Sequence, residues 1–263
     1  MKSRSMVLKA AVVLVSILFS AALASAAEVK VATSGGFSAA LKELAPEFEK
    51  TTGNKIVFIF GPSMGSTPEA IPARLQRGEA IDVIIIVDSA LGNLIKSGKV
   101  TADSRVELAR SGIGMAVRAG APKPDIRTPA AFKQTLLRAK SIAYSDSASG
   151  VYLSTELFQR LGIVDQLKGT ARMIPAEPVG QVVARGEAEI GFQQISELRP
   201  VKGIDIVGPL PSELQKFTVF SAGIATNAKE VEAAKAFVRF LSSPKAAPVI
   251  TKSGMEPITA KQK

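Results

Sequence analysis

Short, continuous apolar runs alternate with amphipathic helical patterns along most of the chain. Ile56–Phe60 and Ile81–Val87 are apolar at nearly every position, as expected for strands that are buried on both faces of a parallel sheet. The stretch Val29–Leu41 begins as a strand, breaks at two glycines, and continues with apolar residues spaced as on one face of a helix. Three such strand–loop–helix units predict right-handed βαβ connections and an α/β fold.

The same pattern recurs in the second half of the chain. Further strands are predicted at Ile113–Arg118, Ser141–Tyr144 and Ala188–Phe192. The long, apolar strands around Gly114 and Gly223 are expected to cross between two lobes. We therefore expect a two-lobe α/β fold with a hinge and a central ligand cleft. Residues 27–110 plus 222–263 form lobe 1 in this prediction, and residues 111–221 form lobe 2.

Loops rich in glycine and serine follow several of the predicted strands. They are Ser34–Gly36, Gly61–Thr67 and Ser145–Gly150. Ligands of open α/β sheets bind at the carboxyl ends of the strands. The first turn of a helix offers unpaired backbone N–H groups to an anion, and glycine lets a ligand approach the backbone closely. These loops together predict a cleft that binds an anion.

Polar residues at these strand ends also have structural explanations. Ser66 or Thr67 is expected to cap a helix that has Pro68 at its first position. A hydroxyl can cap a helix and contact a ligand in turn, so both uses stay open at this point. Asp88 and Asp146 are interpreted as helix N-caps, because an acid in an anion site repels the ligand.

The beginning of the chain has the features of a secretory signal peptide. Three basic residues precede the apolar run Ala10–Leu23, which is short for a membrane span and ends in Ala24-Ser25-Ala26. We therefore predict that residues 1–26 are a cleaved signal peptide and that the mature protein is periplasmic.

Composition excludes several classes of chemistry. The 263 residues include no cysteine and no histidine, which removes thiol chemistry, the commonest general base and the commonest metal ligand. We expect no metal and no cofactor. The net charge is +10, but the basic residues are scattered and are not interleaved with aromatic residues. This distribution disfavours nucleic acid as a partner and fits a small anionic ligand.

Five stretches carry a resemblance to a known family: Ser34–Gly53, Arg74–Ile86, Ser147–Ile163, Pro175–Leu198 and Ala233–Ile258. Through them the chain resembles periplasmic solute-binding proteins of the molybdate-binding family, which have the type II two-lobe fold. The resemblance implies a monomer that holds a small anion and delivers it to an inner-membrane ABC permease. The same resemblance includes isomerases that interconvert the isomers of aconitate.

In that family, one serine in each of the first two loops, backbone amides and a late tyrosine enclose a tetrahedral oxyanion. Carried over to this chain, the first loop supplies Ser34, Gly35 and Gly36, with Gly36 where the serine is expected, and the second loop supplies Ser63, Met64, Ser66 and Thr67. The later positions are Ser149, Gly150 and Val179, with Gln194 at the tyrosine position. Two further candidates come from the residues themselves: Tyr152 flanks the third loop, and Gln193 precedes Gln194 at the end of a predicted strand. A glutamine, which both donates and accepts, and a longer second loop suit an organic polycarboxylate as well as an oxyanion.

Two functions remain open at this stage: capture of a small anion for a transporter, and isomerisation of aconitate by an allylic proton shift. Without histidine or cysteine, the base of an isomerase has to be a carboxylate or a tyrosine. The candidates are Glu69, Asp146, Glu177 and Tyr152. Glu177 is more simply explained by a salt bridge across the hinge.

Overall fold

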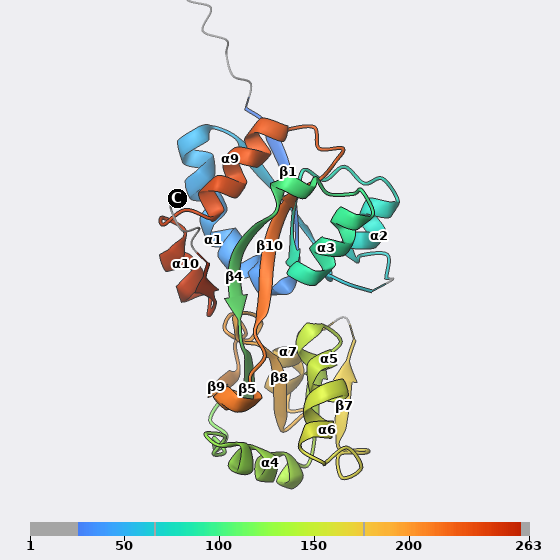
Figure 1. Ribbon diagram of the computed structural model, residues 1–263. Coiled ribbons are helices and arrows are strands. Elements are labelled where there is room, and N and C mark those ends of the chain that lie inside the picture. The colour runs from blue at the N-terminus through green and yellow to red at the C-terminus, as the bar shows by residue number, and fades with distance from the viewer. Residues whose placement is uncertain (1–25, 66, 176, 259–263) are drawn as a thin grey trace, which may run out of the picture.

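The protein is described by a computed structural model that covers residues 26–65, 67–175 and 177–258. Two sheets, each with helices on its faces, form two lobes that lie end to end (Figure 1). This arrangement confirms the predicted two-lobe α/β fold. The predicted signal peptide, apart from Ala26, and the candidate Ser66 lie outside the described residues.

The first lobe contains a six-stranded sheet in the order β11-β4-β10-β3-β1-β2. Its strands are β1 (Glu28–Thr33), β2 (Lys55–Phe60), β3 (Val83–Val87), β4 (Val106–Ser111), β10 (Thr218–Ile224) and β11 (Glu256–Pro257). The helices are α1 (Gly35–Thr52), α2 (Ile71–Gln76), α3 (Asp88–Lys96), α9 (Val231–Leu241) and α10 (Ala247–Lys252), with the short η1 (Ala102–Ser104). β1 pairs in parallel with β2 and β3, as the three predicted βαβ units require.

Two apolar layers hold this lobe together. One face of the sheet packs against α1 and α9, where the rings of Phe48 and Phe237 meet edge to face with centroids 4.8 Å apart. The other face packs against α2 and α3. Because both faces are covered, β3 is apolar at every position. The carboxyl ends of β1, β2 and β3 lie at the edge of the sheet that faces the second lobe (Figure 1).

The second lobe contains a five-stranded sheet in the order β7-β6-β8-β5-β9. Its strands are β5 (Ile113–Arg118), β6 (Ile142–Ser145), β7 (Ala171–Ile174), β8 (Ile190–Gln194) and β9 (Ile204–Pro209). The helices are α4 (Pro129–Arg138), α5 (Ala148–Tyr152), the π-helical η2 (Leu153–Leu157), α6 (Phe158–Arg160), α7 (Val179–Ala184), α8 (Ile195–Leu198) and η3 (Ser212–Leu214). β6 is parallel to β7 and β8, whereas β5 is antiparallel to β8.

The chain crosses between the two sheets twice. β4 leads through Gly112 directly into β5, and the segment 215–217 leads from η3 back into β10. The two crossings are tied to each other, because the Gln215 side chain accepts from the Ile113 N–H (2.8 Å) and donates to the Ile113 carbonyl (3.0 Å). The hinge is therefore a pair of neighbouring strands.

One strand of this fold was not predicted, and one predicted helix begins at another residue. β4 was not predicted, because its sequence VELARS includes charged residues in place of an apolar run. The helix expected to begin at Pro68 begins at Ile71, with Pro72 in its first turn. Proline lacks an N–H and is favoured in the first turn of a helix, where that N–H would have no partner within the helix. The Ile71 N–H donates instead to the Pro62 carbonyl (3.0 Å).

Candidate functional site

The first loop of the candidate site ends at the start of α1. Ser34 is the N-cap residue, with an extended backbone, but its side chain makes no capping bond. The Ser34 hydroxyl is buried without a hydrogen-bond partner. Gly36 lies under the ring of Phe220, where an added Cβ would come within 2.1 Å of Cζ. Packing against β10 therefore explains why glycine stands where a serine was expected.

The second loop places its polar residues differently. Ser63 is buried, and its hydroxyl accepts from the Val87 N–H (3.2 Å), which joins this loop to the start of α3. Met64 and Thr67 are exposed. Glu69, a candidate base, is also exposed, and its carbonyl accepts from Nε of Arg74 (3.0 Å). Ser63 is thus the member of this loop that the fold holds in place.

The third loop, between β6 and α5, forms its own network of hydroxyl groups. The Ser145 hydroxyl lies 2.8 Å from that of Ser147 and 2.9 Å from that of Ser149. An added Cβ at Gly150 would lie 1.6 Å from the Ser145 carbonyl oxygen, so the start of α5 rests directly on the end of β6. These contacts make the loop a compact, internally bonded wall of the second lobe.

The two aspartates interpreted as N-caps do not hold that position. Val87 is the N-cap of α3, and Ser147 is the N-cap of α5. The Asp88 carboxylate instead pairs with Arg105 and accepts from the Ser221 hydroxyl (2.6 Å). Asp146, in the loop after β6, adds a like charge beside Glu197. Both residues come directly after the last residue of a strand. Their carboxylates interact with residues that are distant in sequence and do not cap the helix that follows.

Tyr152 was a candidate both for binding the ligand and for acting as a base. In the structure it is buried, and its hydroxyl and its ring are engaged in contacts within the protein. Its hydroxyl donates to the Leu214 carbonyl (2.8 Å) and accepts from Arg160 (3.1 Å). Nζ of Lys216 lies 4.8 Å from the centre of its ring and forms an ion pair with Glu156 (2.6 Å). Tyr152 therefore anchors the crossing that carries Lys216.

The two adjacent glutamines at the end of β8 point to different places. The Gln193 oxygen accepts from the Val179 N–H (2.9 Å). The backbone N–H of Val179, which was expected to bind a ligand, is therefore already bonded to a side chain of the same lobe. With its amide nitrogen toward the carbonyls of Ser111 (2.9 Å) and Gly112 (3.3 Å), Gln194 accepts from the Thr218 hydroxyl (2.7 Å). Gln194 thus lies at the hinge, and its amide is engaged there.

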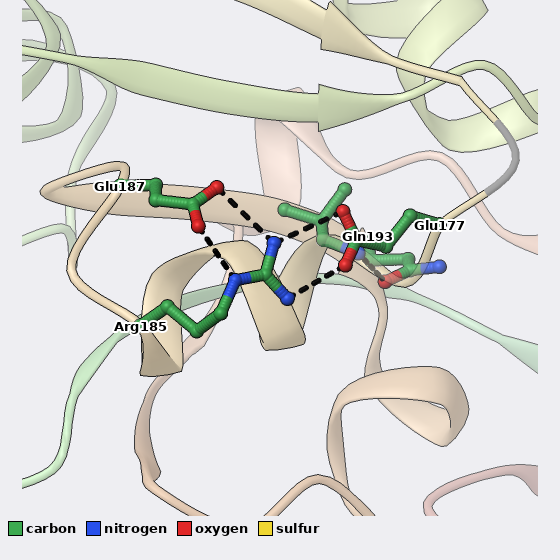
Figure 2. A network of polar contacts seen from close by, with 5 residues as sticks. Glu177, Arg185, Glu187 and Gln193 are labelled. Atoms are coloured by element: carbon green, nitrogen blue, oxygen red, sulfur yellow. Dashed lines mark hydrogen bonds and ion pairs between the residues drawn. The ribbon is translucent and has the colours of Figure 1, made fainter.

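Glu177 lies in a charged network near Gln193, which Figure 2 shows. Arg185 binds the Glu177 carboxylate with two bonds, of 2.6 and 3.1 Å, and binds Glu187 as well (2.6 Å). The Arg185 guanidinium lowers the pKa of Glu177 and of Glu187. The expected salt bridge of Glu177 exists, but it lies within the second lobe rather than across the hinge.

Glu197 was missed by the sequence analysis. This partly exposed residue of α8 reaches the first lobe, because an added Cβ at Gly35 would lie 2.3 Å from its Oε1. Burial of the carboxyl group raises the pKa of Glu197 to about 7. Hydrogen bonds from the Gln193 side chain and from the Gln194 backbone lower this pKa and offset part of the effect of burial. The sequence offered one local signal, a glutamate three residues after a strand end.

A cavity of about 270 Å³ lies between the lobes. Its lining comes from both lobes and from the crossing: Val87, Asp88, Ser89, Ile113, Ala148, Tyr152, Lys216, Phe217, Thr218 and Val219. Lys216 was not predicted, because nothing local distinguishes it from the other scattered lysines. A larger cavity of about 460 Å³ lies under α4 and β5, away from the glycine- and serine-rich loops.

Two kinds of structure are not found in the part of the chain that is described. Its acidic residues nowhere gather in a group of three or more that could hold a metal ion. Within the same residues, every helix is too short or too polar to cross a bilayer.

Comparisons with known proteins agree on one family. Residues 29–256 match the family described as bacterial extracellular solute-binding protein. The chain is 54% identical over 230 residues to an aconitate isomerase from Pseudomonas sp, covering 88% of both chains. It is 30% identical over 245 residues to the molybdate-binding protein ModA of Azotobacter vinelandii, covering 89% of this chain and 92% of that protein.

A solved structure with the same fold is the periplasmic molybdate-binding protein of Azotobacter vinelandii. It superposes with a TM-score of 0.69 at 24% identity, covering 89% of this chain and 100% of that one. The likeness extends over both lobes, which agrees with the fold described above.

Proposed function

The chain belongs to the family of bacterial extracellular solute-binding proteins, and from that premise we propose that it is an isomerase of aconitate. The reaction moves a proton from the methylene carbon of a small tricarboxylate to the far vinylic carbon, shifts the double bond, and so interconverts the cis and trans isomers. The identity of 54% to a relative named aconitate isomerase supports this choice over simple capture of an anion.

The observation that carries the proposal is the mixed lining of the interlobe cavity. Lys216, which is paired with Glu156, supplies a cation, and Ser89 and Thr218 supply hydroxyl groups, whereas Val87 and Ile113 supply hydrocarbon surface. Asp88 also lines the cavity, and Arg105 balances its charge. A bare tetrahedral oxyanion has polar atoms on every side and gains nothing from apolar walls. An organic acid has both carboxylates and a carbon skeleton, and it matches such a lining.

The start of α1 supplies a second place for a carboxylate. The first-turn N–H groups of a helix have no partner within the helix and lie at the positive end of its dipole. The unpartnered Ser34 hydroxyl lies at the same helix end. We assign one carboxylate of the substrate to this end and another to the vicinity of Lys216.

A direct assay tests the proposal. The purified mature protein is incubated separately with cis- and trans-aconitate, and the two isomers are followed by NMR. We expect both solutions to converge on one mixture, with deuterium entering the ligand when the solvent is D₂O. Unchanged spectra in both solutions would exclude the isomerase.

A second candidate is a capture protein for a small anion that serves an inner-membrane ABC permease. The helix end at α1 and the 30% identity to a molybdate-binding protein favour it. A thermal-shift panel of molybdate, sulfate and organic acids distinguishes the two, because a ligand at 100 times its Kd stabilises the fold by about 2.7 kcal/mol. Stabilisation by an anion with no turnover of aconitate would favour capture.

We also propose that the protein is exported to the periplasm and works as a monomer. The family is one of extracellular proteins, and the basic and apolar start of the chain supports export. The mass of the protein recovered from the periplasm tests both the export and the predicted removal of residues 1–26.

A further inference from the structure

The carboxyl group of Glu197 crosses from one lobe to the other. It rests against the backbone of Gly35, in the first turn of the 18-residue helix α1. The Ser34 hydroxyl at the same helix end is buried and has no partner. This hydroxyl can donate to a ligand without giving up an internal bond. A proton-carrying group, a free donor and a helix end therefore meet between the lobes.

The surroundings of Glu197 are polar but almost uncharged. Gln193 and the Gln194 N–H donate hydrogen bonds to it, and Asp146 contributes the like charge. α1 contributes Gly35, which has no charge. Arg199 on the same helix binds the Lys252 carbonyl of α10 (3.1 Å). These neighbours hold the carboxyl group in one place while leaving both its protonation states accessible near neutral pH.

We propose that Glu197 is the residue that removes and returns the proton in aconitate isomerisation, an inference that rests on the proposed function. Its carboxylate takes a proton from the methylene carbon, and the electron pair of the broken C–H bond forms the new C=C bond. The electron pair of the old C=C bond then takes the proton from the Glu197 carboxyl group at the former vinylic carbon. One C–H bond breaks and one forms, so no oxidant, reductant or co-reactant is needed.

The helix end explains why this site would lower the barrier. Removal of the proton moves negative charge onto the carboxylate next to the reacting carbon. A carboxylate at the first turn of α1 receives N–H groups and the positive end of the dipole where that charge develops. Gly35 lets the Glu197 carboxyl group lie directly against this helix end, because an added Cβ there would come within 2.3 Å of its Oε1.

The other candidate bases are less suited to proton transfer in the cleft. Glu177 is held by Arg185, which lowers its pKa and so weakens it as a base. The Tyr152 hydroxyl is bonded to Leu214 and Arg160. Glu69 is exposed on the loop before α2. Asp146 lies beside Glu197, and its charge favours the protonated form of that residue.

A structural role for Glu197 is the competing explanation. It is the third residue of α8 and reaches back to the N–H of the N-cap residue Gln194, as in a capping box. Glu197→Gln keeps an oxygen for that bond but cannot carry the proton. The full mature chain is compared with Glu197→Gln, Glu197→Asp and the surface control Glu232→Gln. Isomerisation is followed by NMR, and binding by the thermal shift with trans-aconitate.

We expect Glu197→Gln to bind trans-aconitate with an undiminished thermal shift and to lose isomerisation by about 10²–10⁴-fold. Glu197→Asp keeps part of the activity, and Glu232→Gln keeps all of it. For the wild type, kcat/KM rises with pH through about 7, after correction for ionisation of the substrate.

Each other result has a defined meaning. If Glu197→Gln isomerises aconitate at the wild-type rate, the inference is overturned. It is also overturned if Glu197→Gln loses binding of trans-aconitate together with activity. In both cases the proposed function stands. Absence of turnover by the wild type overturns the proposed function itself. Should Glu197→Gln fail to fold, the pH profile decides, and a flat kcat/KM between about pH 5 and 8 overturns the role of Glu197.

Discussion

The two walls of the cleft differ in how far their polar groups are already satisfied. In the first lobe, the Ser34 hydroxyl has no partner, and Gly35 at the start of α1 is exposed. In the second lobe, Ser149 is bonded to Ser145, and the Val179 N–H is bonded to Gln193. At these positions the first lobe presents a donor that is ready for a ligand, whereas the groups of the second lobe are bonded to each other. Ser196 of α8 is an exception in the second lobe, because its buried hydroxyl also has no partner.

This difference assigns separate tasks to the lobes. Donors without internal partners bind a ligand without breaking existing bonds, so anion binding is expected to depend mainly on the first lobe. A wall that is already bonded is rigid, which suits the positioning of a reacting group. Glu197 belongs to that rigid wall and yet touches the first lobe. Closure of the hinge would bring the bound anion and this carboxyl group together.

The largest change in stability is expected for substitutions of two glycines, one in each wall of the cleft. Gly150→Ala forces a Cβ to within 1.6 Å of the backbone carbonyl of Ser145, which is held in β6. Gly36→Ala meets the Phe220 ring at 2.1 Å, and a side chain can move further than a strand. We expect a loss of unfolding free energy of about 3 kcal/mol or more for Gly150→Ala, and of about 1–3 kcal/mol for Gly36→Ala. Chemical denaturation measures both.

Gly92→Ala is the control for this pair. Gly92 lies in α3, and an added Cβ there meets nothing within 4 Å. Alanine favours the helix over glycine by about 1 kcal/mol, so this variant keeps or gains stability. Equal stability of Gly150→Ala and Gly92→Ala would show that the wall of the second lobe is not tightly packed.

A smaller change in stability is expected when pH changes the protonation of the Glu197 carboxyl group, which lies between the lobes. The pKa of Glu197 is raised from 4.5 to about 7, so the folded state holds its proton where the unfolded chain has released it. The free energy of unfolding therefore falls as pH rises from about 4.5 to 7, by about 1–3 kcal/mol at most, and is constant with respect to this group above that range. Thermal unfolding of the wild type and of Glu197→Gln across this range measures the difference.

Only the wild type should show this part of the slope. The lowered pKa values of Glu177 and Glu187 act in the opposite direction and at lower pH, where these carboxylates become protonated. They are present in both proteins and cancel in the comparison. Identical slopes for the two proteins would mean that the Glu197 carboxyl group is not buried between the lobes.

The smallest expected effect compares two serines. Ser149→Ala removes a buried hydrogen bond to Ser145 and is expected to cost about 1 kcal/mol of stability. Ser34→Ala removes a hydroxyl without a partner, so stability is unchanged or slightly higher. The same variant loses one donor to the anion, which weakens binding of trans-aconitate by about fivefold. Unfolding and ligand titration, done on both variants, separate stability from binding; a loss of stability in Ser34→Ala contradicts the comparison.

Local sequence patterns were enough to predict the fold class and the position of the loops. Buried strands such as β3 are continuous apolar runs, and helices such as α1 repeat their apolar residues at helical spacing. Both patterns are local, so they are readable without knowing what lies next to them. The glycine- and serine-rich loops were found for the same reason, because they lie where one local pattern ends and the next begins.

The contacts of the loops, in contrast, come from packing between segments that are distant in sequence. Gly36 meets Phe220, and Gly35 meets Glu197, over separations of more than a hundred residues that no local pattern records. β4 carries charged residues and takes its place in the sheet from pairing with β10. The raised pKa of Glu197 depends on burial between two lobes that are distant in sequence. Side-chain environment is created by packing, and for that reason the loops were predicted while the position and the pKa of Glu197 were not.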